Sequence, residues 1–274
     1  MAKRYIGFLC WMTLCAHGQD AREIVRRAVE LDQNNWATRA DYTWIGHSRE
    51  RHFNARNEVT SDRRVSWEVL IIDGLPFTRE LSRDGKPLAA AEERKERQKL
   101  DKETARLAGE TPADKQKHAA DFEKSRRHER AFLLEIPDAF DLRLDGSDTI
   151  DGQEVWVISG VPKPGYRART RDGAALSKIR GKMWIEKAGN QWVRVEAETI
   201  QTISFGVFLA RLSPGAKLVL EQTKINDNLW LPKREYMSGK GRVALVKRIS
   251  EDDEITWTDY KKFQVDSRIV PRQP

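Results

Sequence analysis

The segment KMWIEKAGNQWVRVEA, residues 182–197, decides the fold class of this chain. On both sides of Ala188-Gly189-Asn190, hydrophobic residues alternate with polar ones, as they do in a strand that buries one face. A short turn containing Gly and Asn between two such runs predicts a β-hairpin. Antiparallel β-structure is therefore the starting point, and it extends in both directions along the chain.

Alternating runs of the same kind occur before and after this hairpin. Turn signals fall about every ten residues, which is typical of one continuous antiparallel sheet or barrel. The expected strands begin near Tyr42, Val65, Val155, Leu218, Leu229, Arg242 and Ile255, and the predicted turns are Asp73-Gly74, Asp84-Gly85, Asp145-Gly146 and Asp151-Gly152. Residues 205–212 are apolar enough to be buried, and their pattern fits either a short helix or a strand.

An amphipathic helix is expected before the first strand. Asp20 is a good N-cap residue, Glu23 follows at the spacing of a capping box, and apolar residues recur at helical intervals as far as Leu31. Asn34-Asn35 is expected to end this helix. Because the helix must bury its apolar face, we predict a mainly β (α+β) fold in which a curved sheet receives the helix on its concave face.

Residues 87–131 interrupt the β-pattern. They are rich in strong helix formers and poor in apolar residues, and Pro112 follows Thr111 at a natural first helical position. Closely spaced charges of both signs are typical of exposed helices. We predict an inserted, charged helical hairpin, which is either a solvated decoration or a docking surface for a partner.

The first eighteen residues have the layout of a secretory signal peptide. Lys3 and Arg4 precede an apolar run at Tyr5–Cys15, and small residues stand at Ala16 and Gly18. The run is too short to span a bilayer. A buried first strand or helix is the alternative. Cleavage near Gly18 predicts an exported, periplasmic protein that is soluble after this cleavage.

Removal of residues 1–18 also removes both cysteines, Cys10 and Cys15. Lipid attachment at either is disfavoured, because Leu precedes each where a small residue is usual. The remaining residues 19–274 are expected to form a single domain without disulfides, thiol nucleophiles or cysteine-based metal sites.

The charge balance constrains the partners only loosely. The chain has 274 residues, with 49 Lys and Arg against 42 Asp and Glu, a net charge of +7. Such a balance suits nucleic acid or an anionic membrane surface. Export argues against nucleic acid, so we expect at most peripheral contact with a membrane.

Motifs that carry catalytic or metal chemistry do not occur in this sequence. There is no HExxH, phosphate-binding loop or nucleophile elbow, and Ser238-Gly-Lys-Gly241 is expected to be a hairpin turn. The series Asp145, Asp148 and Asp151 does not fit a calcium loop. We expect no catalytic residue, no metal and no cofactor, and an enzyme built from scattered residues is the alternative.

Tryptophans are the most informative side chains. Most lie in predicted strands, where large rings either fill the core of a sheet or line a cavity for an apolar ligand. The residues predicted to line such a cleft are Trp44, Trp67, Trp156, Trp184, Phe205 and Phe208.

Four segments resemble a known family. They are the strand with Tyr42-Thr43-Trp44, D-G-x-x-x-W-V-I-x-x-x-P-K at 151–163, W-I-E-K-x-x-x-x-x-V-R-V-E at 184–196 and L-W-L-P-K at 229–233. Together with the leader and first helix, they are similar to the outer-membrane lipoprotein-sorting (LolA/LolB-like) superfamily, which includes the RseB/MucB-type sensor domain. S-F-G-x-F-L-A-R-L at 204–212 and the charged insertion are similar to an uncharacterised exported branch of it.

The resemblance implies an open half-barrel sheet covered by helices, with a hydrophobic cleft that shields acyl chains. On this basis we expect a non-catalytic binding or carrier protein for a lipid or a lipoprotein. The alternative is an envelope interaction or stress-sensor module that docks a protein partner through the charged helices. The insertion at 87–131 departs from the usual carrier.

Overall fold

The computed structural model describes residues 20–205, 210–227, 229–243 and 247–263. Its elements are, in chain order, α1 (Ala21–Thr38), η1 (Arg39–Asp41), β1 (Tyr42–Phe53), β2 (Val59–Ile72), β3 (Leu75–Arg83), β4 (Lys86–Pro87), α2 (Ala90–Ala108), α3 (Pro112–Arg130), η2 (Ala131–Glu135), α4 (Ile136–Ala139), β5 (Phe140–Ile150), β6 (Gln153–Pro162), η3 (Asp172–Lys178), β7 (Ile179–Glu186), β8 (Trp192–Thr199), β9 (Ile203–Phe205), β10 (Ala210–Leu212), β11 (Lys217–Asn226), β12 (Leu229–Val243) and β13 (Lys247–Lys262). The proposed leader, residues 1–18, lies outside the described residues. In the described part, no helix is both long and apolar enough to cross a membrane.

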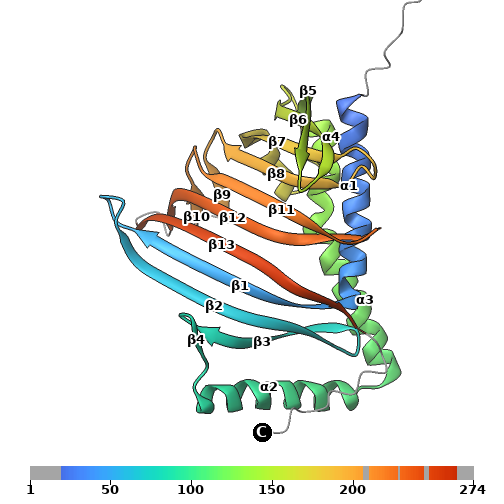
Figure 1. Cartoon of the computed structure of the whole chain (residues 1–274), viewed down its shortest axis with the longest axis vertical. Coiled ribbons are helices and arrows are strands. Elements are labelled where there is room, and N and C mark those ends of the chain that lie inside the picture. Colours follow the sequence, from blue (N-terminus) through green and yellow to red (C-terminus); the bar gives the residue numbers. More distant parts are fainter. Residues whose placement is uncertain (1–19, 206–209, 228, 244–246, 264–274) are drawn as a thin grey trace, which may run out of the picture.

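The strands form one open antiparallel sheet, as predicted (Figure 1). Its order is β4-β3-β2-β1-β13-β12-β11-β8-β7-β6-β5, and β10 pairs with β12 and β9 at the side. The last strand therefore lies between β1 and β12, with Gly46 of β1 opposite Trp257 of β13. The pairing of β1 with β13 places the first and last strands in the middle of the sheet and leaves β4 and β5 as its edges.

Most predicted turns are confirmed, and two are wrong. Asp73, Asp84 and Asp151 adopt positive φ angles of 50°, 52° and 48°, each before a glycine that also has positive φ. Asp145-Gly146 is not a turn but lies inside β5, where the register with β6 shifts between Leu144 and Gly146. A bulge accommodates the same Asp-Gly pair without ending the strand.

The segment predicted as a turn at Ser238–Gly241 is also part of a strand. It lies within β12, and Gly241 pairs with Leu212 of β10. A Cβ atom on Gly241 would lie 2.4 Å from the carbonyl oxygen of Arg211. The glycine is needed because two backbones approach closely there. The region around Leu212, left open by the sequence, forms strands β9 and β10.

Helix α1 begins as predicted and ends later than predicted. The Asp20 side chain accepts a hydrogen bond from the Arg22 amide at 2.9 Å. The helix continues past Asn34-Asn35 to Thr38, because the Asn35 side chain is buried and donates to Gln191 Oε1 at 2.5 Å. A tertiary hydrogen bond thus outweighs the local tendency of asparagine to end a helix.

The main core lies between α1 and one face of the sheet, called here the inner face. The α1 side chains Ile24, Val25 and Val29 are buried against Ile158 of β6 and Ile185 of β7. Helix α1 crosses the sheet from the β5 side toward β12 (Figure 1). Sheet and helix therefore protect each other from water, as the amphipathic pattern predicts.

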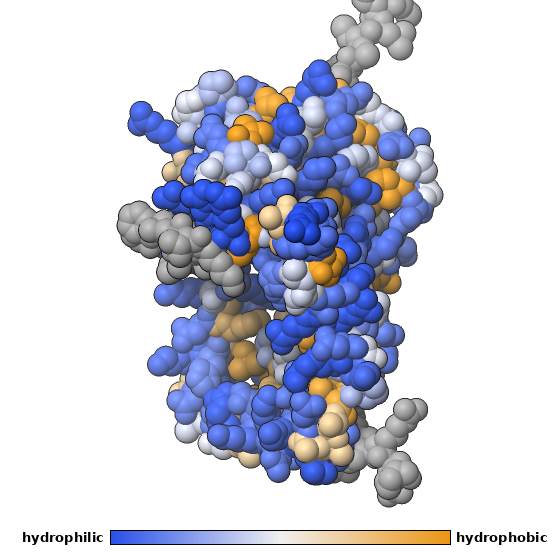
Figure 2. Space-filling view, turned by 90° about the vertical axis from the view of Figure 1, so that its left-hand side faces the viewer, coloured by the Kyte–Doolittle hydropathy of each residue, from blue (hydrophilic) through white to orange (hydrophobic). Residues whose placement is uncertain are grey.

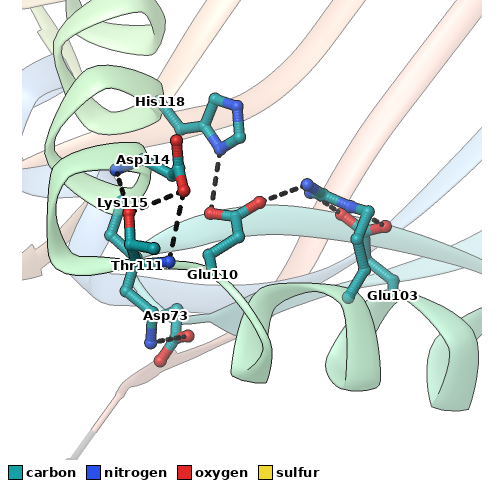
Figure 3. Close-up of polar contacts among 8 residues, drawn as sticks. Asp73, Glu103, Glu110, Thr111, Asp114, Lys115 and His118 are labelled. Carbon is teal, nitrogen blue, oxygen red and sulfur yellow. Dashed lines mark hydrogen bonds and ion pairs between the residues drawn. The ribbon is translucent and has the colours of Figure 1, made fainter.

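The insertion forms two charged helices, as predicted. In Figure 1, α2 runs along the β3 edge of the sheet, whereas α3 turns away and runs beside α1. Figure 3 shows the corner, where Thr111 caps α3 and Glu110 accepts hydrogen bonds from Arg106 and, at 3.0 Å, from His118. Lys115 also bonds to Asp73 in the β2–β3 turn at 2.9 Å, so the corner is tied to the sheet.

Glu135 anchors the segment that leads into η3. Its side chain is 1% exposed and accepts hydrogen bonds from the Tyr166 hydroxyl, the Arg169 amide at 2.7 Å, and the Thr170 amide and hydroxyl at 3.0 and 2.5 Å. Burial alone raises the pKa of Glu135, but these hydrogen bonds outweigh it and lower the pKa to about 2.

We predict that Glu135 makes folding pH-dependent in a defined range. Because its folded pKa lies below its ordinary value, its contribution is present above about pH 4.5 and is lost as the pH falls toward 2. E135Q replaces one acceptor oxygen with an amide NH₂ group, which then faces hydrogen-bond donors instead of accepting from them. The variant should therefore have a free energy of unfolding about 2 kcal/mol lower than the wild type at pH 7.

Urea unfolding between pH 2 and pH 7 measures both effects. E135Q should lose part of the acid dependence of the wild type. The exposed Glu154, 78% exposed and 3.8 Å from Lys187, provides the control variant E154Q, which should resemble the wild type. An unchanged pH profile for E135Q would contradict the prediction.

Candidate ligand-binding site

A cavity of about 340 Å³ lies between the inner face and the helices that cover it. Its sheet wall comes from seven neighbouring strands, β13, β12, β11, β8, β7, β6 and β5. With strands about 4.8 Å apart, this wall extends roughly 25–30 Å across the sheet. The volume lies within the range of ~300–1,000 Å³ found for ligand pockets.

The cavity changes in character along its length. At the β5–β6 end the lining is apolar. At the β13 end the helices add charged side chains, and both the helices and the sheet add tryptophans. The apolar lining includes Leu133, Ile136, Phe140, Leu142, Ile158, Leu176 and Met183. At the other end lie Asp32, Trp36, Arg39, Arg130 and Trp257. The site therefore has an apolar part and a polar, aromatic part.

A chain of buried polar side chains holds α1 above the cavity. Asn35 donates to Gln191 at 2.5 Å, Gln191 donates to Gln222 at 2.9 Å, and Gln222 donates to Asp32 Oδ1 at 2.9 Å. Arg130, the last residue of α3, forms an ion pair with Asp32 Oδ2. Burial raises the pKa of Asp32, while Arg130 and Gln222 counteract this shift. The chain fixes the helix position through contacts from the β7–β8 turn, β11 and α3.

The contacts between α3 and α1 give the charged insertion a structural role. Besides the Arg130 ion pair, Arg126 of α3 donates to the carbonyl oxygens of Trp36 and Ala37, both at 3.3 Å. The end of α3 thus caps the end of α1 and completes a cavity wall. The insertion is more than a solvated decoration at this point.

Trp36 lies between two cations at the polar end. The guanidinium carbon of Arg39 is 4.5 Å from the Trp36 ring centroid, and that of Arg130 is 4.3 Å from it. Arg39 also lies 4.2 Å from the Trp44 ring and 5.9 Å from the Trp257 ring. Three tryptophans therefore surround one buried guanidinium and stabilise it through cation–π interactions.

Two of the tryptophans predicted from the sequence lie on the inner face near this end. Trp44 contacts Arg39, and Trp67 lies opposite Gly46, which in turn lies opposite Trp257. A Cβ atom on Gly46 would lie 2.4 Å from the Trp67 ring, so only glycine leaves room for it. Trp44 and Trp67 border the polar end, although neither belongs to the lining residues of the described part.

The other predicted residues are spread over both faces. Trp156 packs with the α1 core on the inner face. Trp184 packs with Val155 and Trp230 in a separate cluster on the other face. The backbone of Phe205 is in β9, and Phe208 lies outside the described residues. A contact of these side chains with a ligand stays a prediction.

The lining tryptophans themselves, Trp36, Trp192 and Trp257, were missed as site residues. A signal for Trp36 exists in the sequence: it stands four residues after Asp32 and seven after Val29, on the helix face that is buried. The expected helix end at Asn34-Asn35 hid this periodicity. Trp257 could not be found in this way, because only the β1–β13 pairing brings it to α1.

A second cavity of about 470 Å³ adjoins the first. Both share Phe132, Ile179 and Ala197 in their walls. Figure 2 shows the molecule from the side of the strand ends, with a mostly hydrophilic surface and a hollow in which hydrophobic side chains are visible. In the described part of the chain, no cluster of three or more His, Cys, Asp or Glu residues fits a metal ion.

We predict strong coupling between Asp32 and Arg130. D32N leaves the Arg130 guanidinium without its anion, and R130M leaves a buried carboxylate, so each change should cost about 3 kcal/mol of unfolding free energy. In the double variant D32N/R130M the cost should be clearly smaller than the sum, with a coupling of about 2 kcal/mol or more.

A double-mutant cycle by urea unfolding measures this coupling. The exposed pair Arg26–Glu30 on the same helix serves as the control, at 2.6 Å and with both side chains at least half exposed. Because both side chains are exposed to water, its coupling should be close to zero beside that of the buried pair. Additive effects at Asp32 and Arg130 would show that the buried pair does not hold α1.

No family model matches the chain, and no curated protein matches it in sequence. Among solved structures, an outer membrane lipoprotein-sorting protein domain from Vibrio parahaemolyticus is similar at 14% identity and a TM-score of 0.34, with 89% of this chain and 95% of that chain covered. A LolA superfamily protein from Nitrosomonas europaea is similar at 10% identity and a TM-score of 0.30, with 89% and 93% covered.

A third similar structure is that of MucB in complex with MucA, at 10% identity and a TM-score of 0.23, with 87% of this chain and 94% of that chain covered. These structures bear the names of the superfamily that the sequence resembles and of its sensor branch.

Proposed function

We propose that this protein is a non-catalytic binding protein that holds an acyl chain of a lipid or a lipoprotein in the cavity beneath α1. The observation that carries the proposal is the cavity itself, about 340 Å³ in volume and walled by apolar side chains such as Leu133, Ile158 and Met183. A well-packed protein keeps few voids larger than a water molecule. An apolar space of this size therefore suits an apolar occupant.

The energetics of such binding are favourable. Burial of each methylene stabilises the complex by about 0.8 kcal/mol, so ten methylenes contribute about 8 kcal/mol before the cost of association. The apolar end at β5 and β6 supplies the matching surface. This contribution favours the acyl chain bound in the cavity over the same chain in water.

The most buried acid of the cavity lining supports binding rather than chemistry. Asp32, the most buried acid of the lining, is held by Arg130 and Gln222. Both of its oxygens are thus engaged in holding the helix. A general acid or base needs an oxygen within reach of a substrate proton.

We further propose that the protein acts as a carrier after export to the periplasm. The leader-like residues 1–18 motivate this part of the proposal. A carrier must cover its cargo during transfer, and α1 with the end of α3 covers the inner face in that manner.

A cavity-filling variant tests the proposal. Leu220 and Val219 are neighbours on β11, and only Leu220 belongs to the cavity wall described above. L220W adds volume to the space for the chain, so it should weaken binding of a fluorescent 16-carbon fatty acid at least tenfold.

V219W is the matched control, since its side chain points to the other face of the same strand. It should bind the fluorescent fatty acid within about twofold of the wild type. Circular dichroism and thermal unfolding confirm that both variants are folded. Wild-type protein that takes up no fluorescent fatty acid or lipopeptide would overturn the proposed function.

A further inference from the structure

Arg39 is a buried cation at the polar end of the cavity, and among the described residues its charge has no counter-ion. The residue is 9% exposed, and within the described part of the chain its side chain makes no ion pair and no hydrogen bond. Its Nε atom is fully buried and without a partner. A buried charge left in this state is costly, so the position calls for an explanation.

The charged groups around Arg39 do not supply the missing anion. The ionisable groups that act on it are Tyr260 and the cation Arg130. Tyr260 uses its hydroxyl to donate to the Pro232 carbonyl oxygen at 2.8 Å. Burial, with a smaller contribution from Arg130, lowers the pKa of Arg39 to about 10, so the group is still charged at neutral pH.

Four carboxylates that line the same cavity have partners elsewhere, and the fifth, Glu235, whose pKa is raised by burial, is not among the groups that act on Arg39. Glu221 pairs with Arg194 at 3.3 Å, Glu196 pairs with Arg194 at 2.6 Å, and Glu129 accepts from Ser125 at 2.9 Å. Asp32 is taken by Arg130. The cavity acids therefore leave Arg39 without a salt bridge.

The three tryptophans compensate only part of this charge. Trp36, Trp44 and Trp257 present ring faces to the guanidinium. A guanidinium, however, also has five N–H donors in its plane, and ring faces are poor acceptors for them. The site thus stabilises a cation and leaves its donors available toward the cavity.

We propose that Arg39 binds the anionic head of a single-chain amphiphile, a carboxylate or a phosphate, whose apolar chain extends along the cavity toward β5. The proposal rests on the proposed function and specifies its ligand class. Arginine binds both anions through paired N–H donors. The order of the lining supports this direction, because the cation is at the β13 end and Phe140 and Leu142 are at the other end.

The test compares probes that share a 16-carbon chain and differ in the head. Wild-type protein is titrated with palmitate, hexadecyl phosphate and the neutral hexadecanol at pH 8, in competition with a bound uncharged fluorescent acyl probe. Palmitate, hexadecyl phosphate or both should bind about tenfold or more tightly than hexadecanol. The two anionic arms distinguish a carboxylate from a phosphate head.

The variant R39M removes the charge and keeps an apolar side chain of similar length. It should lose the preference for the anionic probes while its affinity for hexadecanol stays within about twofold. R39K, which keeps the charge without the paired donors, should retain an intermediate preference. R26M is the control, because Arg26 lies on α1, just before the η1 turn that carries Arg39, and is already paired with Glu23 and Glu30.

Two results overturn this inference. If hexadecanol and the anionic probes bind the wild type equally well, the proposed function stands and the assignment of Arg39 falls. If no 16-carbon probe binds at all, the proposed function falls and takes this inference with it. The wild-type comparison needs no variant, so it decides the matter even if R39M is unstable.

Discussion

The ion pair between Asp32 and Arg130 is the interaction on which the rest of the structure depends. It joins α1 to the end of the charged insertion, and Gln222 ties the same carboxylate to the sheet. These bonds fix the height of the helix above the inner face. Packing alone would draw the helix onto the sheet, because apolar surfaces reduce their contact with water. The polar chain therefore holds open a space that apolar side chains line.

The position of this polar chain explains why binding and stability are linked. The α1 face that buries Val25 and Val29 toward the β5 side also carries Trp36, and Arg39 follows directly after the helix, in η1. The same helix thus closes the core at one end and forms the site at the other. A shift of the helix would change the cavity along its whole length, and the charged insertion resists such a shift through Arg130.

The sheet could be predicted from the sequence, because alternation and Asp-Gly turns are local signals. The open antiparallel sheet, the first helix and the charged helices are confirmed, while the turns at Asp145-Gly146 and Ser238–Gly241 and the end of α1 were predicted wrongly. All three errors arise where strand pairing or a tertiary contact outweighs a local preference. The site was harder to predict, because the β1–β13 pairing and the burial of Arg39 involve residues distant in sequence.

The central claim is that the cavity beneath α1 holds one acyl chain. Native mass spectrometry of the full chain, purified from cells and followed by organic extraction, tests it most directly. The account predicts a mass increase that matches one lipid or acylated peptide per protein, which extraction then recovers. A mass equal to that of the polypeptide alone, unchanged after incubation with a mixture of lipids, would contradict the account.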